Sequence, residues 1–197
     1  MIDFDIVTII IGILILAVLC IYIKCVTKKT NIYLFFFSVF YIYLINVLKY
    51  TIFPIPLDMA EVFKDNCVFS DGINMIPFNN ISFQSLLEKQ VLYNILLSIP
   101  FGFGIAFITK ITKRKLLVLS VFFGIIVESL QLIISLYLEY TYRIIDINDI
   151  IFNFTGVIVG YCIFKLFSIL LIRFVDNNGL KLGPFSSYIY NISKNSF

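Results

Sequence analysis

The fold is decided by LLVLSVFFGIIVESLQLIISL, residues 116–136, which is apolar at nearly every position. A helix rises about 1.5 Å per residue, so about 20 apolar residues cross a hydrocarbon core of about 30 Å. This run is long enough to do so, although a helix buried inside a soluble protein is an alternative for any single run of this kind. If the run spans a membrane, its Glu128 is an acidic group placed inside that membrane.

Four further apolar runs, at about residues 6–23, 33–50, 91–108 and 150–172, have membrane-spanning length. Charged connectors separate the five runs, and the chain is 60% hydrophobic, 14% charged and has a mean hydropathy of +1.00. Soluble domains are about a quarter charged. The sequence therefore predicts an all-α, polytopic integral membrane protein. It forms a single membrane domain over residues 1–197, with five transmembrane helices and a hydrophilic outer loop at 51–90.

The charges around the runs predict the orientation of the chain. Asp3 and Asp5 precede the first run where a secretory signal carries basic residues, so we expect a retained helix. Cytoplasmic connectors are rich in lysine and arginine. Such residues follow the first, third and fifth runs, whereas the other connectors lean acidic; they are Lys24, Lys28, Lys29, Lys110, Lys113, Arg114, Lys115, Arg173, Lys181 and Lys194. The N-terminus is therefore expected outside and the C-terminus in the cytoplasm.

Polar residues inside or beside four of the runs occur in pairs three or four residues apart, which places both members on one face of a helix. The pairs are Asn46 with Lys49, Asn94 with Ser98, Glu128 with Gln131, and Asp149 with Asn153. When the helices alternate in direction, all four pairs lie toward the outer side. We therefore predict a polar pocket in the outer leaflet, with these candidate ligand-binding residues: Lys49, Asn94, Glu128, Gln131, Arg143, Asp146, Asp149 and Asn153.

Glu128 is the most informative member of this set. It lies about 18 Å along its helix from Leu116, a depth at which a carboxylate is costly. We expect it to face the bundle interior and either to hold a proton or to meet a cation, Arg143 or Lys49. Arg143 suits this role better, because a guanidinium can grip a carboxylate with two hydrogen bonds.

Structural roles are alternatives for several of these residues. Asp146 is placed to cap the helix that follows it, with Asp149 in the first turn. Asn94 and Asn153 could each form a hydrogen bond between helices.

Two other stretches carry expectations about packing. Gly156 and Gly160 have the spacing of close helix–helix packing. INMIPF, residues 73–78, is apolar for a loop, and we expect it to fold back over the pocket.

Five stretches of the chain together carry a resemblance. They are LKY at 48–50, NMIPF at 74–78, NILLSIPFGFG at 94–104, ESLQL at 128–132 and RIIDINDIIFNFTGVIVGY at 143–161. In them the chain resembles the VanZ-like family, over about residues 46–165, with Phe154 standing where a small residue such as Thr is expected. The resemblance implies a helical membrane protein of the bacterial envelope, in a family named after a protein associated with low-level teicoplanin resistance. It implies no established reaction.

Three functions are open at this stage. In the first, the outer pocket binds a membrane lipid or a lipid-linked cell-wall precursor, or reduces the access of a lipidated antibiotic. In the second, the chain is an enzyme acting on a lipid phosphate, with Glu128, Asp146 and Asp149 as acid–base groups or Mg²⁺ ligands. The sequence contains no recognisable nucleophile motif and no histidine that would support this second function. In the third, Glu128 belongs to a proton-coupled transporter.

The surroundings expected for the chain follow from the first function. We expect the cell membrane of a bacterium, and the composition is compatible with a Gram-positive host. We expect no cofactor, no bound metal and no nucleic acid partner. Assembly into a homo-oligomer is left open.

Overall fold

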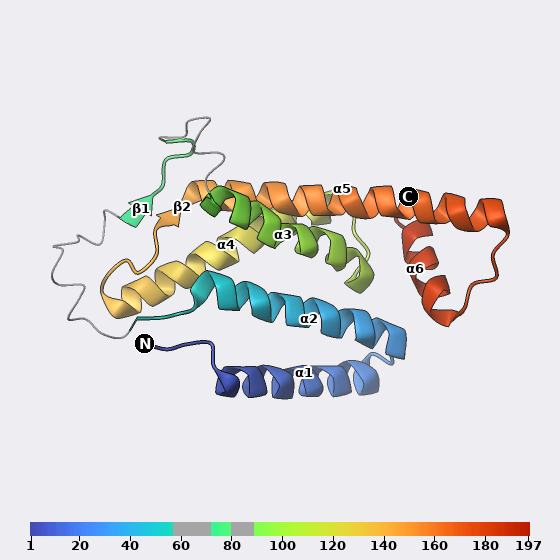
Figure 1. The fold of residues 1–197 in the computed structure, drawn as a ribbon, viewed down its shortest axis with the longest axis horizontal. Coiled ribbons are helices and arrows are strands. Elements are labelled where there is room, and N and C mark those ends of the chain that lie inside the picture. Colours follow the sequence, from blue (N-terminus) through green and yellow to red (C-terminus); the bar gives the residue numbers. More distant parts are fainter. Residues whose placement is uncertain (57–71, 80–88) are drawn as a thin grey trace.

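The structure, a computed structural model of the chain, describes residues 1–56, 72–79 and 89–197 and is built mainly from helices (Figure 1). The helices are α1 (Ile6–Val26), α2 (Asn31–Ile52), α3 (Lys89–Ile108), α4 (Lys113–Leu138), α5 (Ile147–Asn178) and the short α6 (Pro184–Lys194). Two strands of two residues each, β1 (Ile73–Asn74) and β2 (Ile145–Asp146), pair in parallel. Apart from this short pair, the predicted all-α fold is confirmed.

The first five helices are each long and apolar enough to cross a membrane. This confirms the five predicted transmembrane helices, and α5 continues to Asn178, beyond the predicted end of the fifth run at 172. Only 6% of the most apolar window of α1 is buried inside the protein. A helix that is apolar on all sides and largely uncovered is suited to lipid rather than water. The chain is therefore a multi-pass membrane protein.

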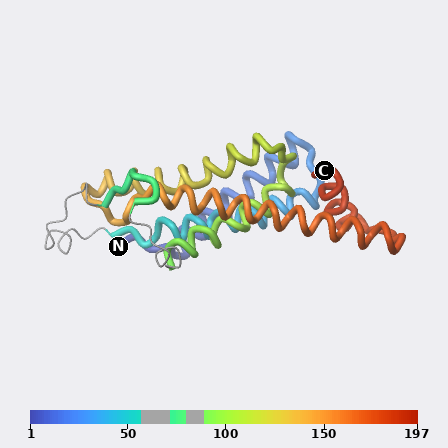
Figure 2. Tube along the Cα trace, turned by 90° about the horizontal axis from the view of Figure 1, so that it is seen from above, coloured from blue at the N-terminus to red at the C-terminus, as the bar shows by residue number. Residues whose placement is uncertain are grey.

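The two ends of the bundle carry opposite charge. The helices alternate in direction, so the starts of α1, α3 and α5 lie at one end and the starts of α2 and α4 at the other (Figures 1 and 2). The first end, here called the acidic end, holds Asp5, Asp146 and Asp149; the second, the basic end, holds Lys28 and Lys110. Which end faces the cytoplasm stays a prediction from this asymmetry, which favours the basic end.

The α3–α5 pair is held together by close backbone contact. A Cβ atom built on Gly160 would lie 2.0 Å from the carbonyl oxygen of Ile99, and one on Gly156 would lie 2.3 Å from that of Ile95. Only glycine permits such an approach, so the predicted packing role of the two glycines is confirmed. The contact fixes α3 and α5 side by side, and the predicted polar residues of the two helices lie toward the acidic end from it.

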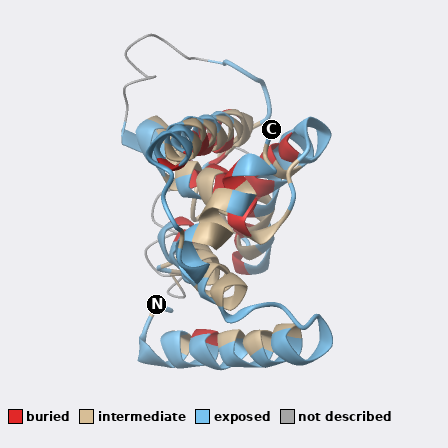
Figure 3. Ribbon diagram, turned by 90° about the vertical axis from the view of Figure 1, so that its right-hand side faces the viewer, coloured by how far each residue is buried: buried red, intermediate tan, exposed pale blue. Residues whose placement is uncertain are grey.

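An apolar core joins these two helices to α2 and α4. Phe101 lies at its centre, with its ring centroid 4.6 Å from that of Phe123 and 5.5 Å from that of Phe40. By contrast, α1 lies outside this core and is mostly exposed (Figure 3). It is joined to α2 through Tyr41, whose hydroxyl donates to the carbonyl oxygen of Gly12 at 3.0 Å.

Candidate functional site

A cavity of about 950 Å³ lies at the acidic end, lined from α2, α3, α4, the connector after α4 and the start of α5. We call it the acidic-end pocket. Its lining combines polar groups with apolar side chains: Tyr50, Thr51, Gln90, Tyr93, Asn94, Leu96, Leu97, Gln131, Arg143, Ile144 and Asp149. Four of the predicted residues line it, namely Asn94, Gln131, Arg143 and Asp149, and they come from different segments. Whether they bind a ligand stays a prediction.

Arg143 is the basic residue of this lining, and backbone holds its guanidinium in place. Its Nη2 donates to the carbonyl oxygen of Phe53 at 3.0 Å, just past the end of α2. A guanidinium has five N–H groups, so this bond uses only part of its donor capacity. Next to it, burial raises the pKa of the Tyr142 hydroxyl, against the opposing effect of the Arg143 charge. Tyr142 is therefore protonated at neutral pH and can donate, as it does to Ile52 at 3.4 Å.

Amide side chains position the rest of the polar lining. Gln131 donates from Nε2 to the carbonyl oxygen of Thr51 at 2.9 Å, which ties α4 to the end of α2. Gln90 donates from Nε2 to Oδ2 of Asp149 at 3.2 Å, which ties the start of α3 to the first turn of α5. Gln90 was not among the predicted residues. Its spacing four residues before Asn94, on the same helical face, is the sequence signal that could have found it.

Glu128 lies outside the lining of the pocket, and of the two alternatives expected for it, a proton or a cation, the structure shows no cation beside it among the described residues. Its side chain is only 6% exposed, and Oε2 accepts from the backbone N–H of Asp146 at 3.2 Å. Within the described residues, no ion pair joins Glu128 to Arg143, which bonds Phe53 instead. The expectation that Glu128 faces the bundle interior is correct. The donor it meets is the backbone N–H of Asp146, at the start of α5.

Asp146 has the structural role given above as an alternative. It is the N-cap of α5, and Oδ1 accepts from the backbone N–H of Asn148 at 2.8 Å. The same oxygen accepts from Nδ2 of Asn74 at 3.0 Å, beside the β1–β2 pair. Phe78 N–H donates to Oδ1 of Asn148 at 2.7 Å. Residues 73–78 were expected to fold back over the pocket; they fold back onto the start of α5, and none of them is among the lining residues. The rest of the loop, 57–71 and 80–88, lies outside the described residues.

Asn153 and Ser98 form a buried bond between α5 and α3. Ser98 Oγ donates to Oδ1 of Asn153 at 2.6 Å, and the two side chains are 0% and 1% exposed. This supports the helix-to-helix role for Asn153. Asn94 differs because it lines the pocket, where its side chain interacts with Asp149. This place in the lining, which Asn153 lacks, makes Asn94 the better candidate for a ligand contact.

The pair Asn46 and Lys49 does not converge with the others, contrary to the prediction. Lys49 is exposed, and its Nζ lies 5.6 Å from the ring centroids of Phe4 and Tyr50. Asn46 Nδ2 donates to Ile42 O within its own helix at 2.8 Å. At this level α2 turns its next residues, Tyr50 and Thr51, toward the pocket.

The carboxylates of this end do not form a metal centre in the part of the chain that the structure describes. No group of three or more His, Cys, Asp and Glu side chains there is placed to hold a metal ion. Asp149 lines the pocket, Glu128 points at the α5 backbone and Asp146 caps that helix. The three acids thus have different hydrogen-bond partners, although they lie close enough to one another to interact electrostatically.

Comparison with known protein families gives a match over the part of the chain that forms the acidic-end pocket. A sequence model of the VanZ/LLP1 family matches residues 40–168, well over half of the 197 residues. The matched range includes every residue that lines the acidic-end pocket, whereas α1 and α6 lie outside it. Searches of the curated proteins and of the solved structures gave no match.

Proposed function

The chain belongs to the VanZ-like family, and from this premise we propose that it acts at the acidic-end pocket on a lipid-linked component of the bacterial envelope. The observation that carries the proposal is the Arg143 guanidinium in the wall of a large cavity whose other polar groups are amides, hydroxyls and the Asp149 carboxylate. A guanidinium recognises phosphate oxygens with two parallel hydrogen bonds. The anionic part of a lipid headgroup is the ligand that this group suits best.

The rest of the lining suits an amphiphile. Asn94 and Gln131 offer amide groups for the polar part of a headgroup, and Leu96 and Leu97 offer apolar surface for the start of a hydrocarbon tail. Asp149 would repel a phosphate, so we assign it to a hydroxyl or an amine on the same headgroup. This mixture of groups favours a phosphate- or peptide-bearing lipid over a simple anion.

The charge asymmetry of the bundle favours an outward-facing acidic end, and therefore an outer-leaflet site. A lipid-linked wall precursor held there would be less accessible to an antibiotic that also anchors in the membrane. Teicoplanin carries a lipid tail and vancomycin lacks one. The proposed action therefore affects teicoplanin more than vancomycin.

The test expresses the wild-type chain, Arg143→Ala and Lys49→Ala in a sensitive Gram-positive host. Lys49 is the matched control, because its loss removes one positive charge from the acidic end outside the pocket lining. We expect the wild type and Lys49→Ala to raise teicoplanin tolerance more than vancomycin tolerance, and Arg143→Ala to lose this difference. Equal sensitivity with and without the protein, at confirmed membrane expression, contradicts the proposal.

A binding assay on purified protein tests the same site directly. Removing a charge-assisted hydrogen bond costs about 1.5–3 kcal/mol, so Arg143→Ala should weaken the binding of a polyprenyl phosphate roughly tenfold to more than a hundredfold. Lys49→Ala should bind as the wild type does. Equal weakening by both substitutions would point to general surface charge instead of the pocket.

An enzyme acting on lipid phosphates is the second candidate, because the Asp149 carboxylate lines the same pocket as Arg143. In this version, Asp149 acts as an acid–base group toward the bound headgroup. Purified protein should then release inorganic phosphate from a polyprenyl phosphate or diphosphate, and Asp149→Asn should not. Intact lipid after incubation with and without Mg²⁺ excludes this candidate and leaves the binding function.

A further inference from the structure

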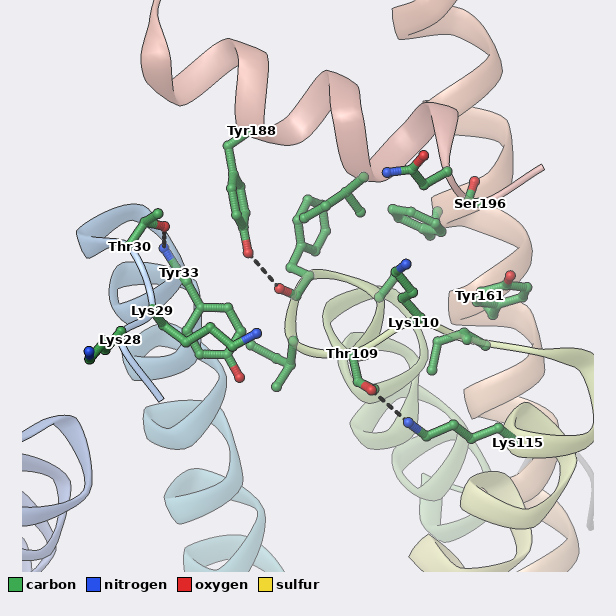
Figure 4. Close-up of a pocket in the computed structure, with 17 residues that line it drawn as sticks. Lys28, Lys29, Thr30, Tyr33, Thr109, Lys110, Lys115, Tyr161, Tyr188 and Ser196 are labelled. Carbon is green, nitrogen blue, oxygen red and sulfur yellow. Dashed lines mark hydrogen bonds between the residues drawn. The ribbon is translucent and has the colours of Figure 1, made fainter. Parts of the chain in front are cut away.

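The basic end contains a second cavity, of about 650 Å³ (Figure 4). Its walls come from the α1–α2 connector and the start of α2, the end of α3, the connector to α4 and the start of α4, the middle of α5, and α6 with the residues that follow it. It lies at the opposite end of the bundle from the acidic-end pocket. The function proposed above makes no use of it.

Lysine dominates the charge of this cavity. Lys28, Lys29, Lys110 and Lys115 are among its lining residues, and that lining contains no Asp or Glu. The contacts that two of these lysines make are with neutral groups. Lys115 Nζ donates to Thr109 Oγ1 at 2.6 Å, and Lys29 Nζ lies 5.2 Å from the ring centroid of Tyr33 (Figure 4). Within the described residues, their positive charge is therefore not neutralised by a carboxylate.

Two helix starts add to the positive potential at the same place. Thr30 caps α2 and lines the cavity, and Thr112 caps α4 in the connector that borders it. The positive end of a helix dipole lies at its N-terminus. The acidic side chain nearest in sequence, Asp176 on α5, is absent from the lining and accepts from the Tyr190 hydroxyl at 2.8 Å. The cavity thus favours an anion.

The opposite side of the cavity is aromatic and amphipathic. Tyr188 of α6 donates to the carbonyl oxygen of Phe107 at 2.9 Å (Figure 4). Behind this pair, Phe36 stacks on the rings of Phe107 and Tyr188, with centroid distances of 4.7 Å and 5.3 Å. These contacts hold α6 across the basic end of the bundle (Figure 1). An amphipathic helix in that position suits the membrane surface. A ligand of this cavity therefore meets cations on one side and aromatic, membrane-level surface on the other.

We propose that the basic-end cavity binds the phosphate of an anionic membrane lipid in the leaflet at that end. The lysine ammonium groups contact the phosphate as point charges, and the tyrosine and phenylalanine rings contact the glycerol and the first methylenes of the lipid. A soluble phosphate ester offers the same anion without the apolar part. The aromatic wall is the feature that favours the lipid over such an ester.

The experiment titrates the purified full chain with phosphatidylglycerol and measures bound lipid by native mass spectrometry. Phosphatidylcholine with the same acyl chains and soluble glycerol 1-phosphate serve as the other two ligands. The cavity variant is Lys29→Gln with Lys110→Gln. The matched control is Lys181→Gln with Lys194→Gln, which removes the same charge from the basic end at two exposed lysines outside the cavity lining.

We expect the cavity variant to bind phosphatidylglycerol roughly thirtyfold more weakly than the wild type. Each lysine near an anionic lipid strengthens binding about fivefold, and the variant loses two lysines. The control should lose less than about threefold. Arginine at the same two cavity positions should restore binding, which separates charge from folding damage, and circular dichroism should show equal helix content in all variants. Equal losses in the cavity variant and the control overturn the proposal. The proposal is also overturned if the cavity variant binds phosphatidylglycerol as tightly as the wild type does, or if glycerol 1-phosphate binds as tightly as the lipid.

Discussion

Replacing Gly160 by alanine tests the contact that holds the acidic-end pocket together. The added Cβ would lie 2.0 Å from the carbonyl oxygen of Ile99 and 2.9 Å from its carbonyl carbon. Real Cβ contacts are not shorter than 3.0 Å, so α3 and α5 must separate locally by about 1 Å. Both atoms belong to the backbone, so no side-chain rotation can relieve the overlap.

The size of the effect follows from two opposing contributions. Overpacking of this kind typically costs about 1–3 kcal/mol, and alanine recovers part of that because its helix propensity exceeds that of glycine by roughly 1 kcal/mol. Because the overlap is with backbone, we take the upper end of the first range, and the net expectation is a loss of about 2 kcal/mol. The chain has no tryptophan, so unfolding is best followed by circular dichroism at the helical band in detergent.

Gly12→Ala is the matched control for this prediction. Gly12 lies in α1, and a Cβ there would be 3.8 Å from the nearest atom, on the Ile45 side chain, which is ordinary contact. Gly12→Ala should therefore leave the melting temperature unchanged or raise it. If Gly160→Ala melts at or above the wild-type temperature, the close α3–α5 approach is not what stabilises this part of the bundle.

Substitutions at three further residues address individual polar contacts, and each is checked by thermal unfolding in detergent. Asp146→Ala removes the α5 cap and the bond to Asn74 and should cost about 1–2 kcal/mol, whereas Asp146→Asn should cost less; equal melting of all three proteins contradicts the capping role. Ser98→Ala leaves Asn153 Oδ1 buried without its donor and should cost about 1–3 kcal/mol. An unchanged melting temperature would show that this hydrogen bond does not stabilise the protein. Glu128→Gln keeps an acceptor for the Asp146 N–H and should be tolerated, whereas Glu128→Leu should cost about 1–3 kcal/mol; the reverse order would refute the assigned contact.

The sequence was sufficient to predict the transmembrane helices and most of the polar face at the acidic end. Helix length follows directly from the length of an apolar run, and the spacing of Asn94 and Ser98 fixes which face of α3 is polar. The same argument placed Gln131 and Asp149 correctly. What spacing cannot provide is the rotation of a helix that is apolar on all sides. This is why Lys49 was assigned to the pocket although it lies outside the lining: its helix, α2, is apolar on nearly all sides, so the sequence does not show which face points inward.

Partners chosen by charge alone were less reliable. Arg143 was matched to Glu128 because opposite charges attract, but each of them bonds a backbone group instead. Arg143 donates to the carbonyl oxygen of Phe53 just after α2, and Glu128 accepts from the N–H of Asp146 just before α5. Which backbone groups lie near a side chain depends on the fold, so these partners could not be predicted from the charges of the side chains. The basic-end cavity was missed for a related reason, because its lysines had been considered only as signals of orientation, and α6 had not been predicted.

The most direct test of the account is an experimental structure of the full chain purified with its native lipid. The account predicts headgroup density between α2, α3 and α4 at the acidic end. Phosphate oxygens should lie about 3 Å from the Arg143 guanidinium, and Asn94 and Gln131 should face the same ligand. An empty or closed pocket, with these three side chains turned to separate surroundings and lipid bound only elsewhere, would contradict it.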